Sequence, residues 1–143
     1  MQHEETTTRY RLLVIDDEES TRLLLARMLS QNLNAEVQLA GTCEQALRLA
    51  STYVYDAILL DLLMPGIGGF GVLIEIRLHS PNSATPVILV TQVTEKDTLD
   101  HCLATGANAY HIKPVERTEL LAIVRDQLAA RTRNKSGTKT TAR

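Results

Sequence analysis

The stretch that decides the fold is Tyr55-Asp56-Ala57-Ile58-Leu59-Leu60-Asp61, which continues as Leu62-Leu63-Met64-Pro65-Gly66. Residues 57–60 form a short apolar run bounded by a turn signal, which predicts a buried strand. Asp61 stands where this strand ends. A carboxylate at the tip of a core strand is costly unless another group compensates its charge. The position of Asp61 therefore predicts chemistry, a metal ion or a partner at this end of the strand.

Length and composition are typical of one globular domain. The chain has 143 residues, 44% of them hydrophobic, with no Trp and one Phe, so the core must be aliphatic. Residues 131–143 hold five basic residues and no acid, so the rest of the chain carries −7 of a total net charge of −2. We expect an N-terminal extension over residues 1–9, an acidic folded domain over 10–130 and a basic flexible tail or linker over 131–143.

Cysteine usage and hydropathy predict a cytoplasmic protein. Cys43 and Cys102 lie far apart and match no metal-ligand or redox spacing, so we expect two small buried thiols in a reducing compartment. The histidines also lack metal-ligand spacing and are expected at the surface: His3, His79, His101 and His111. The longest apolar runs are far shorter than the roughly 20 residues that a membrane helix needs, and the polar N-terminus does not resemble a signal peptide. No contact with a membrane is expected.

Apolar segments of strand length alternate along the chain with segments of helical periodicity. The strands are expected at residues 12–15, 36–40, 57–61, 86–91 and 109–112. The helices are expected at residues 20–31, 42–51, 70–79, 95–105 and 116–130. This alternation predicts a parallel sheet covered by helices on both faces. The first, third and fourth strands are the most apolar, so they should be central. The expected fold is a doubly wound, flavodoxin-like α/β fold of five strands in the order 2-1-3-4-5.

Periodicity and capping signals predict the helix faces and ends. Thr42 and Thr94 are expected N-caps, Thr42 as part of a capping box with Gln45, and Gly106 should end the fourth helix. Several glycines between Met64 and Val72 predict that the third helix begins only near Phe70. The expected buried faces are Leu24, Leu25, Met28 and Leu29 in the first helix, Phe70, Leu73, Ile74 and Leu78 in the third, and Leu120, Leu121, Val124 and Leu128 in the last.

Polar residues stand at the predicted C-terminal ends of four strands. Asp16 and Asp17 follow the first strand and Asp61 the third, while Thr91 ends the fourth and Lys113 follows the fifth. In this winding the ends of strands one and three flank the ligand-binding switch point. Three carboxylates at one point raise each other's pKa, and a hard divalent cation such as Mg²⁺ removes that conflict. With a lysine cation and a hydroxyl added, the set has the parts needed to accept and hold a phosphoryl group.

Four motifs stand at the predicted strand ends: Val14-Ile15-Asp16-Asp17-Glu18, Leu60-Asp61-Leu62-Leu63-Met64-Pro65-Gly66, Pro86-Val87-Ile88-Leu89-Val90-Thr91 and Gly106-Ala107-Asn108-Ala109-Tyr110-His111-Ile112-Lys113-Pro114. Over about residues 10–130 they resemble the receiver domain of two-component response regulators, of the chemotaxis-regulator type. Each motif alone is weak, but the four in this order at these strand ends are specific. The resemblance implies a regulatory switch of a phosphorelay. Such a switch is not an enzyme, although it assists its own phosphorylation and dephosphorylation.

The resemblance implies a role for the acidic residues. Asp61 is the implied phosphoacceptor, which takes a phosphoryl group from a sensor histidine kinase or a phosphotransfer protein. Asp16, Asp17 and Asp61 are the implied Mg²⁺ ligands, together with the backbone carbonyl of Leu63.

The remaining matched residues are implied to hold the phosphoryl group and to transmit its presence. Thr91 and Lys113 contact the phosphoryl oxygens. Thr91 moves toward the phosphoryl group and Tyr110 turns inward, which repacks the surface of the fourth helix, fifth strand and fifth helix. That surface would bind a downstream protein target or a fused effector domain, and it could also support a homodimer.

Two features near the predicted pocket affect what we expect of it. Gln92 follows Thr91 where the family usually has a small residue, so we hypothesise that Gln92, together with Leu63, changes the lifetime of the aspartyl phosphate. Pro114 follows Lys113, and a cis peptide bond between them would direct the lysine inward.

Several alternatives remain open at this point. The chain could be a stand-alone receiver or a receiver excised from a larger multidomain regulator. An Asp-nucleophile phosphatase would usually carry a second acid two residues after Asp61, where this chain has Leu63. A flavodoxin would need a phosphate-binding loop after the first strand, where this chain has consecutive acids.

Two further features have simpler interpretations. Asp16 and Asp17 could simply cap the first helix and interact favourably with its dipole. The basic tail is more consistent with a solvated linker than with nucleic-acid binding.

Overall fold

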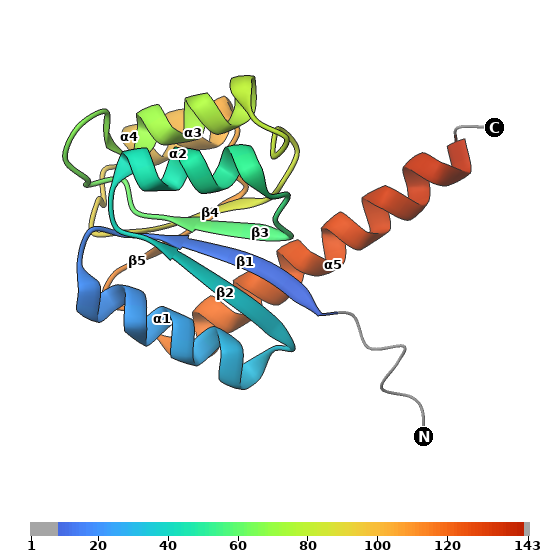
Figure 1. Cartoon of the computed structure of the whole chain (residues 1–143), viewed down its shortest axis with the longest axis horizontal. Helices are drawn as coiled ribbons and strands as arrows, with labels where there is room; N and C mark the ends of the chain where they lie inside the picture. Colours follow the sequence, from blue (N-terminus) through green and yellow to red (C-terminus); the bar gives the residue numbers. More distant parts are fainter. Residues whose placement is uncertain (1–8, 142–143) are drawn as a thin grey trace.

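Five strands and five helices alternate in the computed structural model, which describes residues 9–141, with side chains up to Arg131 (Figure 1). The predicted extension over residues 1–9 and His3 fall almost wholly outside these described residues. The elements are β1 (Tyr10–Ile15), α1 (Glu19–Asn32), β2 (Ala35–Ala40), α2 (Cys43–Thr52), β3 (Ala57–Leu60), α3 (Gly68–His79), β4 (Val87–Thr91), α4 (Lys96–Thr105), β5 (Ala109–Ile112) and α5 (Arg117–Thr141). All neighbouring strands pair in parallel in the order β2-β1-β3-β4-β5, so the predicted fold is confirmed.

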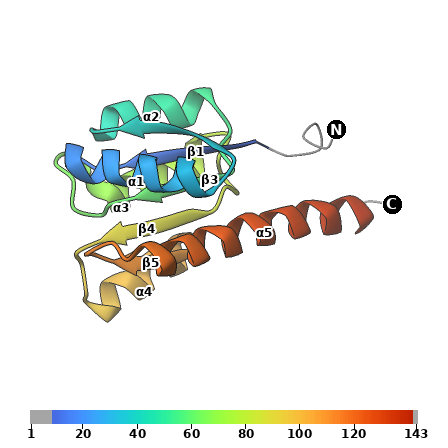
Figure 2. The same ribbon diagram turned by 90° about the horizontal axis from the view of Figure 1, so that it is seen from below.

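Helices cover both faces of the sheet and create two apolar layers. α2, α3 and α4 pack on one face, and α1 and α5 pack on the other (Figure 1 and Figure 2). Successive residues of β1 point to opposite layers, with Leu13 in one and Leu12 in the other. β3 lies at the centre and all four of its residues are buried, as its continuous apolar run predicts. No helix in the described part of the chain is long and apolar enough to span a bilayer.

The strand register brings the C-terminal ends of the central strands to one edge of the sheet. Ile15 pairs with Ala40 on one side and with Leu60 on the other, and Leu60 pairs with Leu89. Thr91 at the end of β4 pairs with Ile112 at the end of β5. The residue that follows each strand is therefore delivered to the same edge, which is what a site built from strand ends requires.

Two of the three predicted helix signals are confirmed. The Thr42 hydroxyl accepts a hydrogen bond from the Gln45 N–H at 3.1 Å, and the Gln45 side chain accepts one from the Gly41 N–H at 2.9 Å. Gly106 ends α4 with a φ of 137°, a conformation that glycine adopts without strain. The prediction for Thr94 is wrong, because Glu95 occupies the N-cap position of α4 and makes no side-chain cap there.

The predicted burial is right for α5 and partly wrong for α1 and α3. Leu24 is 53% exposed, because the narrow stripe of Leu25, Met28 and Leu29 already fills the contact with the sheet. In α3 the residues Phe70 and Ile74 are only partly buried and Leu78 is 68% exposed. The buried α3 face is instead Gly69, Val72, Leu73 and Ile76. α3 is apolar around most of its circumference, so periodicity alone could not select the buried side.

Two helix ends also differ from the predicted ones. α3 begins at Gly68 and not near Phe70, because tight packing of the loop offsets the poor helix propensity of glycine. The Gly69 N–H donates to the Leu62 carbonyl at 3.0 Å, and a Cβ at Gly69 would clash with the backbone of Asp61. α5 continues to Thr141 and extends beyond the sheet (Figure 2), since lengthening an existing helix avoids the cost of nucleation. The division into an acidic domain and a basic tail stays a prediction.

A buried asparagine ties the loops together at the end of the sheet opposite the acids. Asn82 is fully buried and uses both ends of its amide. Its Nδ2 donates to the carbonyls of Ala50 and Tyr53, each at 2.7 Å. Its Oδ1 accepts from the Tyr55 N–H at 2.7 Å and from the Thr85 hydroxyl at 2.9 Å. One side chain thus satisfies backbone groups that would otherwise be buried without partners.

Asn82→Ala should destabilise the fold by about 3 kcal/mol, because each buried polar group left without a partner costs roughly 1–3 kcal/mol. Urea unfolding followed by circular dichroism measures this change. Ser83→Ala, at an exposed residue of the same loop, is the matched control and should have little effect. A loss no greater for Asn82→Ala than for the control would show that the loops do not depend on this amide.

Candidate functional site

Three carboxylates meet at the edge of the sheet where β1 and β3 end. Asp16 and Asp61 are 1% and 5% exposed, whereas Asp17 is exposed to solvent. One carboxylate oxygen of each residue lies within 4.8 Å of a carboxylate oxygen of each of the other two. The sequence prediction that these residues converge is therefore confirmed by the geometry, although the roles assigned to them stay predictions.

Lys113 brings the compensating positive charge to this cluster. Its Nζ lies 2.8 Å from Asp16 Oδ2 and 3.3 Å from Asp61 Oδ2, so one ammonium group contacts both buried acids. Burial alone would lower the pKa of Lys113, but the hydrogen bond and charge of Asp16 and the charge of Asp61 outweigh it and raise that pKa. The lysine is therefore held as a cation at neutral pH.

The ionised form of Asp61 remains unfavourable in the folded protein despite its contact with Lys113. Burial raises its pKa, and the nearby charge of Asp16 adds to the rise. The hydrogen bond from the Leu63 N–H and the charge of Lys113 act in the opposite direction but do not cancel the effect of burial. A carboxylate that is buried, raised in pKa and held beside a specific cation is typical of a functional position.

Backbone hydrogen bonds fix the direction of both buried acids. The Asp61 N–H donates to the Ile15 carbonyl at 3.0 Å, and Asp61 Oδ1 accepts from the Leu63 N–H at 3.1 Å. The Asp16 N–H donates to the Ala40 carbonyl at 3.1 Å, and Asp16 Oδ1 accepts from the Glu18 N–H at 2.9 Å. The carboxylates are therefore pre-oriented by the ends of the strands that carry them.

The donor set fits a hard divalent cation. Two oxygens bound to one Mg²⁺ at about 2.1 Å can be at most about 4.2 Å apart, so the observed oxygens need only small side-chain rotations to share an ion. All three donors are carboxylates, the ligand type that Mg²⁺ prefers, and the exposed Asp17 leaves the site open to water. Asp16, Asp17 and Asp61 are thus the residues that could hold the ion.

Of the predicted switch residues, Thr91 ends β4 and Tyr110 lies within β5, and neither is hydrogen-bonded to Asp61 in the part of the chain with described side chains. Thr91 is fully buried, and its hydroxyl accepts a hydrogen bond from the Val93 N–H at 3.2 Å. Its carbonyl accepts from the Lys113 N–H at 2.8 Å, which joins the ends of β4 and β5. Tyr110 points outward and is 40% exposed. The peptide bond between Lys113 and Pro114 is cis, as the sequence suggests.

A cavity of about 310 Å³ opens beside the acidic cluster. Gln92 is exposed and lines this cavity together with Lys113, so the large residue that departs from the family pattern does border the approach to the site. The other residues that line it are Glu18, Thr21, Leu24, Pro114 and Val115.

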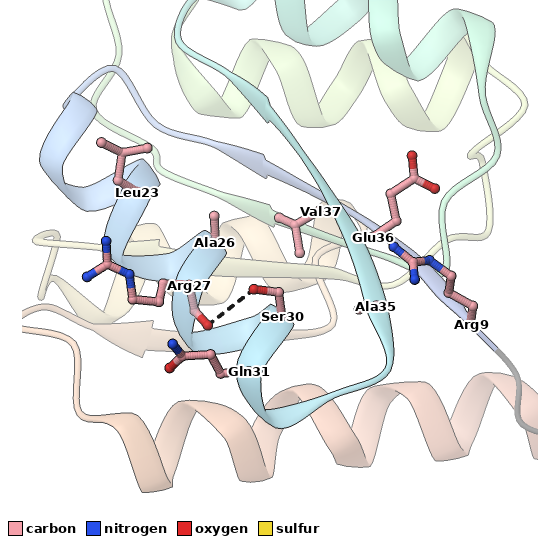
Figure 3. Close-up of a pocket in the computed structure, with 9 residues that line it drawn as sticks. All are labelled: Arg9, Leu23, Ala26, Arg27, Ser30, Gln31, Ala35, Glu36 and Val37. Atoms are coloured by element: carbon pink, nitrogen blue, oxygen red, sulfur yellow. Dashed lines mark hydrogen bonds between the residues drawn. The ribbon is translucent and has the colours of Figure 1, made fainter. Parts of the chain in front are cut away.

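A larger cavity, of about 580 Å³, lies away from the acids, between α1 and the edge strand β2 (Figure 3). Its lining mixes apolar residues such as Leu23 and Val37 with Arg27 and a single acid, Glu36. No cluster of carboxylates converges there among the described residues, because the one such cluster is at the sheet edge. Size alone therefore does not locate the chemistry in this molecule.

One histidine prediction is wrong, and the predictions for the other described histidines and for both cysteines are confirmed. His111 is buried at 3% exposure, so the prediction of a surface position is wrong, whereas His79 and His101 are exposed as expected. The Nε2 of His111 accepts a hydrogen bond from the Glu116 N–H at 3.0 Å. The alternation along β5, with Tyr110 outward, is the sequence signal that could have placed His111 inward. Both cysteines are buried and free, as predicted.

The protein is an α/β domain with a doubly wound parallel sheet. An acidic pocket lies at the C-terminal edge of that sheet, where an aspartate cluster meets a lysine. A model of the response regulator receiver domain matches residues 12–125. The chain therefore belongs to the response regulator receiver domain family of two-component signal transduction.

Known relatives agree with this assignment. The probable transcriptional regulator ycf27 of Cyanidium caldarium is 35% identical over 130 residues, which are 90% of this chain and 50% of that protein. The sensory/regulatory protein RpfC of Xanthomonas campestris pv. campestris is 32% identical over 135 residues, 93% of this chain and 18% of that protein. This chain thus spans half or less of either relative.

A solved structure shows the same fold. The receiver domain of the sensor histidine kinase PA1611 from Pseudomonas aeruginosa superposes with a TM-score of 0.76 at 30% identity. The match covers 85% of this chain and 99% of that one, and that structure has a magnesium ion coordinated in its active-site cleft.

Asp61→Asn should make the protein more stable at pH 7. Because burial raises the pKa of Asp61 above its usual 3.8, the folded protein loses stability as the pH rises through that raised pKa and the buried carboxylate ionises. The asparagine variant avoids this cost, so the gap between the two proteins should be absent below pH 3.8 and open as the pH rises. Urea unfolding at several pH values measures it, with the exposed Asp126→Asn as control. A gap that does not change with pH would contradict the assignment of the cost to Asp61.

Proposed function

We propose that this receiver domain accepts a phosphoryl group on Asp61 from a phosphohistidine of a histidine kinase or a phosphotransfer protein. The observation that carries the proposal is the convergence of Asp61 with Asp16, Asp17 and Lys113 at one edge of the sheet. The fold supports it as well, since ligands of doubly wound sheets bind where the strand order reverses, here between β1 and β3.

The proposed reaction uses Asp61 as the nucleophile. One of its carboxylate oxygens attacks phosphorus and forms the new O–P bond, while the N–P bond of the donor breaks and the departing imidazole nitrogen keeps the electron pair. The Leu63 N–H donates to Asp61 Oδ1 at 3.1 Å, which fixes the orientation of the carboxylate during the attack. Asp16, Asp17 and Asp61, with the Leu63 carbonyl as a further ligand, would hold a Mg²⁺ ion, which would neutralise charge on the phosphoryl oxygens.

Lys113 and Thr91 are proposed to hold the transferred group. The Lys113 ammonium already lies 3.3 Å from Asp61 Oδ2, so it is within reach of oxygens attached there. The Thr91 hydroxyl accepts one hydrogen bond in the present structure and keeps its own proton as a donor. A phosphoryl oxygen would offer Thr91 an acceptor, and Tyr110 on the neighbouring strand could then turn inward.

The proposed output is a change in the surface formed by α4, β5 and α5. This surface would bind a downstream target or a fused effector domain, and it could support a homodimer. The lengths of the relatives are consistent with a fused arrangement, since the chain matches only 50% of ycf27 and 18% of RpfC. The receiver of a larger regulator therefore stays the alternative to a stand-alone switch.

Incubation with a small acyl phosphate and Mg²⁺ should add one phosphoryl group to the protein, detected by intact-mass spectrometry. Asp61→Asn should remain unlabelled, and chelation of Mg²⁺ should suppress labelling of the wild type. Lys113→Ala should slow labelling by about 100-fold, as expected for removal of one group that stabilises transition-state charge. Labelling that survives Asp61→Asn would refute the proposed function.

Gln92→Ala should shorten the lifetime of the aspartyl phosphate. Gln92 lines the cavity beside Lys113, so a smaller side chain should admit water more freely to the phosphorylated site. Loss of the label after removal of the phosphodonor measures the lifetime, and Thr94→Ala, at a nearby exposed residue outside the lining, serves as control. Identical decay in Gln92→Ala and the wild type would show that Gln92 does not limit access.

A further inference from the structure

An arginine of α1 contacts the backbone of the acidic cluster. Arg22 donates from Nη1 to the carbonyl oxygen of Asp16 at 2.8 Å. That carbonyl belongs to the peptide unit that joins Asp16 to Asp17, the two acids at the end of β1. Arg22 forms no ion pair with a carboxylate within the described residues, so its firm contact is with this backbone group.

The guanidinium group of Arg22 packs closely against Gly41. A Cβ built on Gly41 would lie 2.7 Å from Nη1 of Arg22, 3.0 Å from Cζ and 3.4 Å from Nη2. Gly41 does not have the positive φ that would by itself require glycine. A Cβ at position 41 would therefore require the flexible end of the Arg22 side chain to move away from its present place.

This contact completes the restraint of Asp16. Its N–H is held by Ala40, its side-chain oxygens by Glu18 and Lys113, and its carbonyl by Arg22. Asp17, in contrast, is exposed, and its direction depends on the peptide plane that precedes it. Arg22 is the side chain that fixes this plane.

We propose that Arg22 is a positioning residue for the divalent-cation site, and that Gly41 provides the space that it needs. Arg22 orients the peptide between Asp16 and Asp17 so that both carboxylates face one ion. The inference rests on the proposed function, because it assumes that these acids bind Mg²⁺. Residues that orient metal ligands typically affect metal affinity although they do not touch the metal.

A purely electrostatic role for Arg22 predicts the opposite result. A cation close to the site repels Mg²⁺, so removing its charge would tighten Mg²⁺ binding. Loss of positioning would instead weaken binding. Gly41→Ala separates the two effects, because it displaces the guanidinium group without removing its charge.

The test is a Mg²⁺ titration of the full chain, followed by amide chemical shifts in NMR, for Arg22→Ala, Gly41→Ala and the double variant. Arg22→Ala should raise the Kd for Mg²⁺ by about tenfold, the lower end of the range for residues that orient metal ligands. Gly41→Ala should raise it in the same direction, and the double variant should bind no more weakly than Arg22→Ala, because the added methyl group then has nothing to displace. Arg27→Ala, at an exposed arginine of the same helix, is the control.

Two further measurements complete the design. The rate of labelling by an acyl phosphate should match the wild type at saturating Mg²⁺, with only the half-saturating concentration raised. Arg22→Lys keeps a positively charged donor group, so it should bind Mg²⁺ more tightly than Arg22→Ala. It replaces Arg22→Ala as the test variant if Arg22→Ala does not fold. An unchanged or lower Kd in Arg22→Ala, or additive effects in the double variant, would overturn the inference alone. A wild type that binds no Mg²⁺ would overturn the metal site of the proposed function as well.

Discussion

The contact between one lysine and two buried carboxylates is the constraint on which the site depends. Asp16 and Asp61 repel each other at the end of adjacent strands, and Lys113 compensates both at 2.8 and 3.3 Å. β5 lies two strands from β3, a separation of about 10 Å at the usual strand spacing. Only a long side chain can cross β4 to reach the acids, which explains a lysine with its four-carbon stem at this position. The strand order thus decides both which acids meet and which residue can neutralise them.

This arrangement favours function over stability. The pKa of Asp61 stays raised even with Lys113 beside it, so the folded protein is less stable with this carboxylate ionised. The opposite end of the sheet shows the reverse situation, because the neutral amide of the buried Asn82 makes four hydrogen bonds. At Asn82 the polar groups of the amide are matched by hydrogen bonds to neutral groups. At the acidic cluster the charges of Asp16 and Asp61 are only partly compensated, and the proposed cation and phosphoryl group would resolve that conflict.

The sequence predicts what local patterns encode and fails where tertiary contacts decide. The order of the strands and the convergence of the acids follow from apolar runs and the residues that end them, so both could be predicted. The buried face of α3 could not, because the helix is apolar on nearly every side. The burial of His111, by contrast, follows the alternation of β5, which is a local signal, and its Nε2 accepts a hydrogen bond from the Glu116 N–H just before α5. The contact of Arg22 with the Asp16 carbonyl lies against Gly41, a close approach that no spacing along the chain reveals.

The contacts of β5 suggest how a charge at Asp61 would be transmitted. Thr91 and Lys113 share a backbone hydrogen bond, so movement at either residue acts directly on the end of β5. On one face of this strand His111 is buried and bonded to the backbone at the start of α5, which anchors that face. On the other face Tyr110 is exposed, so it can move without breaking a core contact. We therefore expect the response to phosphorylation to be largest on the Tyr110 side of β5, beside α4, and smallest along the contact between β5 and α5.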